Sequence, residues 1–215
     1  MNNKTFYWAA AGLAAGVAAY VAVIRPWHLH WGASEVEEVQ FLPGDELVPA
    51  PTDMCTHAIT IQAPIEDVWP WLAQMGQDRG GFYSYAWLEN LVGCHMHNAD
   101  RIVPEFQHIK VGDPIWLHPR VPPLPVVHVQ PGRVLVMGSN MDEPGTWGFF
   151  LQKIDDNTTR LIVRGQGQRK PGLLRGLIQY LLYEPAHFIM ERKMLLAIKQ
   201  QAETASRQRK MELAA

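Results

Sequence analysis

The stretch "THAITIQAPIEDVWPWLAQMGQDRGGFYSYAWLEN", residues 56–90, changes its hydrophobic period in the middle. Residues 58–61 alternate in the manner of a short β-strand. Pro64 then stands near the start of a helix, where its missing N–H costs little. The apolar residues that follow recur at helical spacing: Val68, Trp71, Leu72 and Met75. The stretch therefore predicts a strand that leads directly into a helix.

The second half of the same stretch predicts a tight turn and another short helix. Gly76 is placed to end the first helix, and Gly80 and Gly81 let the chain turn sharply. A second helix is expected over 85–92, with Gly93 as its C-cap. A phosphate-binding loop is disfavoured because the glycines follow a helix and lack the Lys-Ser/Thr of a P-loop.

Downstream of these helices, several strand candidates follow one another and are separated by turn sequences such as "QPGR" and "DDNT". They are residues 114–117, 126–129, 134–138, 147–154 and 160–165. Consecutive strands joined by short turns indicate an antiparallel meander.

The end of the chain has helical periodicity. One apolar face comprises Leu173, Leu174, Leu177, Ile178, Leu181 and Leu182. Pro185 is expected to interrupt or kink this helix, which then resumes up to Ala202, with a frayed tail over 206–215. An antiparallel sheet with helices on one side is the α+β arrangement that buries these faces.

The N-terminal segment is apolar. Residues 5–24 carry no charge over about the 20 residues that cross a bilayer core. The run is longer than the ~7–15 apolar residues of a cleaved signal peptide, so a retained anchor over 1–25 is expected. Lys4 and Arg25 flank it, and their balance favours a single-pass protein of the cell membrane with its main domain outside the cytoplasm. A Pro-rich linker over 26–55 would lead into a domain over 56–205.

Composition narrows the function classes. The 215 residues are 47% hydrophobic and 19% charged, with a formal net charge of -2, which is typical of a globular protein. There is no basic face of the kind that nucleic acid requires. The two cysteines, Cys55 and Cys94, are either buried thiols or one disulfide.

The element order, with "APIEDVWPWLAQMGQDRGGFYSYAWLEN" (63–90) and "MERKMLLAIKQQAE" (190–203), resembles the START/polyketide-cyclase-like superfamily (SRPBCC) in its bacterial membrane-tethered branch. The resemblance covers residues 52–204, and "QMGQDRGGFYS" is its most specific part. It implies a helix-grip fold, in which a curved antiparallel sheet wraps a long C-terminal helix around an apolar cavity. Members include lipid carriers, hormone receptors and aromatic cyclases, so the resemblance implies no single activity.

The aromatic residues beside the glycine turn have two interpretations: a plain turn between helices, with Arg79 in a local salt bridge, or the lip of a ligand pocket. The sheet and the last helix add further candidates, among them a buried ion pair between Arg164 and Glu191, which would need each other if buried. The candidate ligand-binding residues are Arg79, Phe82, Tyr83, Tyr85, Trp87, Glu89, Asn90, Trp147, Arg164 and Glu191.

Two functions follow as hypotheses. The first is a membrane-tethered module that binds or transfers a hydrophobic small molecule such as a lipid, isoprenoid or polyketide-like compound. The alternative is a cyclase or dehydratase that uses Tyr83, Glu89 or Asp100 as acid and base. His95 and His97 beside Cys94 would share one face of a strand, but no motif supplies a further ligand, so neither a metal nor another cofactor is expected. The sequence does not identify a protein partner.

Overall fold

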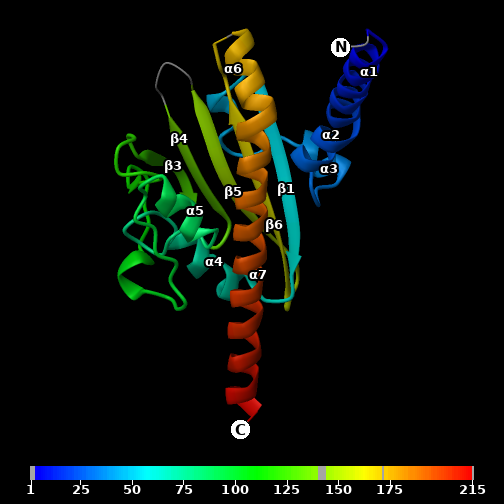
Figure 1. The fold of residues 1–215 in the computed structure, drawn as a ribbon. Helices are drawn as coiled ribbons and strands as arrows, with labels where there is room; N and C mark the ends of the chain where they lie inside the picture. Colours follow the sequence, from blue (N-terminus) through cyan, green and yellow to red (C-terminus); the bar gives the residue numbers. More distant parts are fainter. Residues whose placement is uncertain (1–2, 140–143, 171, 215) are drawn as a thin grey trace.

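The computed structural model describes residues 3–139, 144–170 and 172–214. Within these ranges a curved six-stranded antiparallel sheet has the strand order β1-β6-β5-β4-β3-β2, and a long C-terminal helix lies across it (Figure 1). The strands are β1 Asp53–Ile61, β2 Pro114–Ile115, β3 Leu124–Gln130, β4 Val134–Ser139, β5 Gly145–Asp155 and β6 Thr158–Gly167. Each predicted strand is present, and the helix-grip arrangement expected from the sequence is the observed one.

The two faces of the sheet carry different clusters. On the inner face, Phe149, Leu161 and Val163 are buried against the helices. On the outer face, Val136, Phe150 and Ile162 form a smaller core. Because side chains alternate along a strand, Leu161 and Val163 lie on one face of β6 and Ile162 lies on the other.

The helices α4 (Ile65–Ala73) and α5 (Ala86–Leu91) lie where the sequence predicts them, and a glycine turn joins them. Gly76 and Gly81 pair across this turn at φ of 129° and 75°, conformations that favour glycine. A Cβ at Gly81 would come within 2.5 Å of Asn98 Oδ1. These glycines therefore serve the geometry of the turn.

The C-terminal region is helical from Leu173 onward. It consists of α6 (Leu173–Ile178), a π-helical turn η4 (Gln179–Tyr183) and α7 (Glu184–Ala214). The wide turn directly precedes Pro185, whose missing N–H it accommodates without breaking the helix. The expected frayed tail is instead the last part of α7, where Arg209 pairs with Asp67 at 2.9 Å.

The N-terminal region comprises α1 (Asn3–Ala19), the π-helical turn η1 (Tyr20–Ile24) and α2 (Arg25–Leu29). Judged by length and apolar character together, none of the helices formed by the described residues would cross a bilayer. The segment expected to be an extended linker differs from that expectation. It contains α2, α3 (Glu35–Val39), the 3₁₀ turn η2 (Asp45–Leu47) and the beginning of β1.

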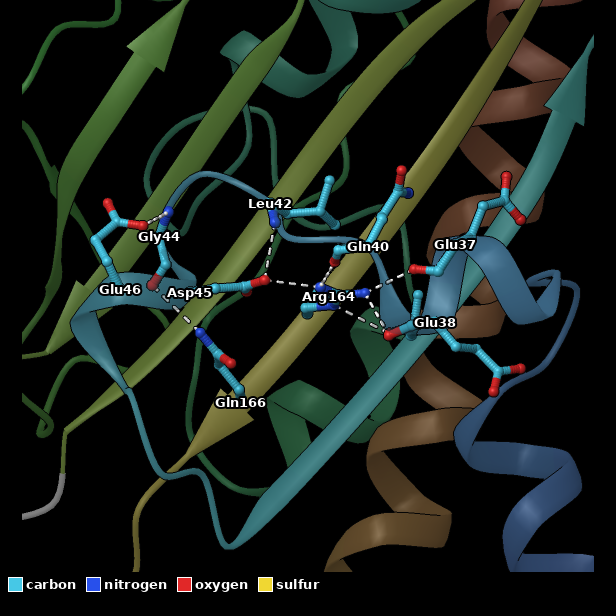
Figure 2. A network of polar contacts seen from close by, with 10 residues as sticks. Glu37, Glu38, Gln40, Leu42, Gly44, Asp45, Glu46, Arg164 and Gln166 are labelled. Atoms are coloured by element: carbon cyan, nitrogen blue, oxygen red, sulfur yellow. Dashed lines mark hydrogen bonds and ion pairs between the residues drawn. The ribbon is translucent and has the colours of Figure 1, made fainter.

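Arg164 attaches this N-terminal segment to the outer face of the sheet. Its side chain is 3% exposed and forms an ion pair with Asp45 at 2.8 Å (Figure 2). Its remaining N–H groups donate to the backbone carbonyls of Glu37, Glu38 and Gln40 and to Thr56 Oγ1. The guanidinium is thereby fully supplied with acceptors, as a buried charge requires.

The predicted ion pair between Arg164 and Glu191 is therefore wrong. Arg164 projects from the outer face of β6, whereas α7 packs on the inner face, beside Leu161 and Val163. The sheet separates the two charges, and each has found partners on its own side.

We expect Arg164→Met to lower the stability of the protein strongly, because Asp45 and the carbonyls of the N-terminal segment would lose their shared donor. Loss of one partner of a buried ion pair costs about 3–5 kcal/mol, or a fall in Tm of roughly 10 °C for a chain of this size. Thermal unfolding followed by tryptophan fluorescence measures this change. Arg133→Met, at an exposed position, is the matched control and should leave Tm nearly unchanged.

Candidate ligand cavity

A cavity of about 540 Å³ lies between the inner face of the sheet and the segment from η4 into α7. Three inward positions at this end of β5 and β6 are glycines, Gly145, Gly165 and Gly167, so no side chain fills the space there. Apolar side chains form much of the remaining wall: Met54, Phe82, Leu117, Leu124, Trp147, Phe188, Met190 and Met194.

The cavity has a buried end and an exposed end. His57, Glu191 and Met194 line it and are almost fully buried. Gln168 and Tyr183 line it too, yet both are exposed to solvent. The mouth therefore lies between the end of β6 and the end of η4.

The buried end contains a hydrogen-bonded polar cluster centred on Glu191. His57 Nδ1 lies 2.6 Å from Glu191 Oε1, and His57 Nε2 lies 2.7 Å from the backbone oxygen of His28. Trp147 Nε1 donates to Glu191 Oε2 at 2.9 Å. His187 Nε2 lies 3.6 Å from the same oxygen, which is too long for a hydrogen bond. The cluster joins β1, β5 and α7.

The geometry suits an ion pair in this cluster. When Glu191 is ionised, both neighbours of the His57 ring are acceptors, and the imidazolium donates to them from its two nitrogens. Burial by itself would lower the pKa of His57, but the charge and hydrogen bond of Glu191 raise it. Burial would likewise raise the pKa of Glu191, but the rings of His57 and His187 outweigh that effect and lower it. The two residues form a buried ion pair.

Two titratable groups of the cavity remain able to act on a ligand. The His187 side chain is 31% exposed and stacks on Tyr183 near the mouth. Glu89 lines the cavity from α5, and its buried Oε2 has no hydrogen-bond partner among the described residues. Burial raises the pKa of Glu89, which favours the neutral acid, a hydrogen-bond donor.

The structure brings four of the predicted site residues to the cavity, namely Phe82, Glu89, Trp147 and Glu191. Tyr83 instead packs in the core, where its hydroxyl donates to the Trp71 carbonyl at 3.1 Å. Asn90 bonds the backbone of Met96 and so holds the loop after α5.

The other predicted residues also lie outside the cavity. Arg79 donates to the carbonyls of Ala73 and Phe106, in place of the expected local salt bridge. Trp87 is exposed, Tyr85 precedes α5, and Arg164 lies on the outer face. The glycine turn is thus a structural element with Phe82 at the cavity wall.

The residues that sequence reasoning missed are the histidines of the cavity. His57 shares the inward face of β1 with Ile59 and Ile61, and that alternation was a usable signal. His187 precedes Glu191 by one helical turn, a spacing that brings side chains together.

The histidines that the sequence did single out do not form the expected strand. Residues 94–99 are irregular, with Cys94 buried and His95 and His97 exposed. Asp100 is exposed and does not line the cavity. Cys94 and Cys55 are both free thiols, so the disulfide alternative does not hold.

Comparisons with known proteins found similarity among solved structures. No family model and no curated protein matches the chain. Among solved structures, hypothetical protein jhp0584 from Helicobacter pylori matches 79% of this chain and 99% of its own, at 9% identity and a TM-score of 0.47. The Polyketide_cyc-like protein Cgl2372 from Corynebacterium glutamicum matches 74% and 93%, at 14% identity and a TM-score of 0.33. DynU16, a putative protein in the dynemicin biosynthetic locus, matches 73% and 49%, at 16% identity and a TM-score of 0.43.

The ion pair of the cavity predicts a pH dependence of stability. Glu191, with its lowered pKa, contributes stability above its ordinary value of 4.5, and this is lost as the pH falls through the folded pKa. His57, with its raised pKa, contributes stability that is complete below its ordinary value of 6.5 and is lost as the pH rises through the folded pKa. The contribution is therefore greatest between these two ordinary values.

We expect the difference in unfolding free energy between wild type and His57→Gln to be largest in that window and to shrink as the pH rises above it. Denaturant unfolding at a series of pH values measures it. A difference that does not change with pH would contradict the assignment of the charged pair.

Proposed function

We propose that the chain binds a hydrophobic small molecule with one polar group and holds or transfers it at a membrane. The observation that carries the proposal is a cavity with largely apolar walls and one charged cluster at its buried end. Its volume of about 540 Å³ falls in the range of small-molecule sites.

The polar end of the cavity suits a hydroxyl or carbonyl group. His187 Nε2 and Glu191 Oε2 lie 3.6 Å apart, so a ligand hydroxyl can accept from the first and donate to the second. The ion pair with His57 keeps Glu191 ionised and oriented before a ligand arrives. Lipid, isoprenoid or polyketide-like molecules with such a group fit this arrangement.

The membrane part of the proposal concerns residues 1–25, which would hold the domain against the bilayer that supplies the ligand. Residues 5–24 are uncharged, and several of their apolar side chains are exposed, among them Val21 and Val23. Such exposure is expected of a segment surrounded by lipid.

The full chain, purified in detergent and examined by native mass spectrometry, should carry a co-purified apolar molecule. Met190→Trp should lower its occupancy at least about tenfold, equivalent to ~1.4 kcal/mol of binding free energy, because the larger ring enters the cavity. Ile189→Trp is the matched control, since Ile189 is the exposed neighbour on the same helix.

Occupancy at the wild-type level in both tryptophan variants would contradict binding in this cavity. Loss of the bound molecule in both would point to a general effect on α7, which circular dichroism would show independently.

A second candidate function, dehydration or cyclisation of the bound molecule, is favoured by Glu89. A carboxyl group whose pKa is raised by burial can protonate a departing hydroxyl while a base, here His187, takes a proton from the adjacent carbon. One molecule of water is released, and a carbon–carbon double bond forms.

The compound extracted from Glu89→Gln protein distinguishes the two functions. If the chain is a dehydratase, this compound should be heavier than the wild-type compound by the mass of one water, because the amide cannot supply the proton. Identical masses would support binding alone, and His108→Gln, outside the cavity, is the control.

A further inference from the structure

The segment from α6 through η4 exposes an unusual amount of apolar surface. Leu173 is 85% exposed and Leu182 is 67% exposed. Leu174, Leu177, Ile178 and Leu181 between them are also exposed. These side chains cover about half of the helix circumference, a wider face than a helix needs to pack against one sheet. Nothing in the described part of the chain covers them.

This apolar segment lies at the same end of the molecule as α1, opposite the C-terminus (Figure 1). Contacts join the C-terminal end of the N-terminal helices to η4 and the first residue of α7. Arg25 pairs with Glu184 at 2.8 Å and stacks 4.5 Å above the ring of Tyr180. The Tyr20 hydroxyl donates to the backbone oxygen of Tyr180. The exposed face of α6 is therefore held in a fixed position beside the N-terminal helix.

The charged residues within the segment and the loop before it are all basic. From Gly167 to Tyr183 the charged residues are Arg169, Lys170 and Arg175, and the sequence has no Asp or Glu there. Arg169 is partly neutralised by Asp53 at 2.7 Å. Basic residues beside an exposed apolar helix complement the negative surface of an anionic bilayer.

The same segment borders the mouth of the cavity. Gln179 and Tyr183 of η4 line the cavity, and Arg169 lies at its rim, stacked 5.0 Å above the Tyr183 ring. A surface that rests on lipid here would place the mouth next to the bilayer.

We propose that α6 and η4 form an interfacial membrane-contact element that inserts its leucines into the surface of an anionic bilayer, beside the cavity mouth. The six residues of α6 and the five of η4 reach only ~16 Å at ~1.5 Å per residue, about half of a bilayer core, so the element lies in the interface and does not cross it. The inference does not require a particular cavity ligand.

The test uses spin labels on the full chain in vesicles. Leu174→Cys and Leu181→Cys place labels on the apolar face, and Ile154→Cys places the control label on an exposed position of β5. Cys55 and Cys94 are replaced by Ser in all three, and unchanged thermal unfolding shows that this background is folded. Flotation with vesicles of phosphatidylcholine and phosphatidylglycerol precedes the measurement of collisions with oxygen and with a water-soluble nickel chelate.

The two α6 labels should meet the nickel chelate about tenfold less often than the control label and should favour oxygen, as residues in the lipid interface do. Lys170→Gln with Arg175→Gln should reduce this protection and its dependence on phosphatidylglycerol.

Each other outcome is decisive. Protein that fails to float contradicts both the membrane anchor and the α6 surface. Protein that floats with α6 labels as accessible to nickel as the control retains the anchor and overturns the α6 proposal. Dipolar coupling between α6 labels of two chains, with little access to either reagent, shows that a second copy covers the leucines and also overturns it. Ligand occupancy by mass spectrometry tests the proposed cavity function separately.

Discussion

The ion pair between His57 and Glu191 is the constraint on which the site depends. Burying either charge alone would be costly, so each requires the other in place. The second ring nitrogen of His57 bonds the His28 backbone oxygen, and Trp147 bonds the second oxygen of Glu191. One cluster thus fixes α7 against β1 and β5 and fixes the N-terminal segment against both. The cavity lies beside this cluster, where three inward positions of β5 and β6 are glycines.

Each face of the sheet carries one of the two buried charge clusters described above. Thr56 and His57 are neighbours in β1, yet Thr56 contacts Arg164 on the outer face and His57 contacts Glu191 on the inner face. The outer cluster holds the segment that contains α3 and η2, and the inner one shapes a site. Because side chains alternate along β1, the residues that attach the N-terminal segment and the residues that line the proposed ligand cavity lie on opposite faces of the sheet.

The proposed membrane contact indicates the end from which a ligand would enter the cavity. Its buried end carries the ion pair, and its mouth lies beside η4, where apolar and basic side chains are exposed together. A hydrophobic ligand that enters from lipid would then pass Arg169 at the rim and reach the buried ion pair last. That order matches a molecule whose polar group leads and whose apolar part follows, and it applies equally to transfer and to catalysis.

The sequence by itself determined the elements, because their periods are local. The alternation around Leu161, Ile162 and Val163 predicted a strand with two distinct faces, and the spacing of Val68, Trp71 and Leu72 predicted α4. Phe82, Glu89, Trp147 and Glu191, four of the ten candidates named from the sequence, line the cavity, and a cavity was expected only from the family resemblance. Tertiary structure decided which charges meet. Arg164 and Glu191 are both buried, and the sequence paired them, but the partner of a buried charge depends on the face of the sheet from which it projects and on what packs there. The docking of α7 on one face and of residues 37–45 on the other settled that choice, because it fixed which acceptors each charge could reach.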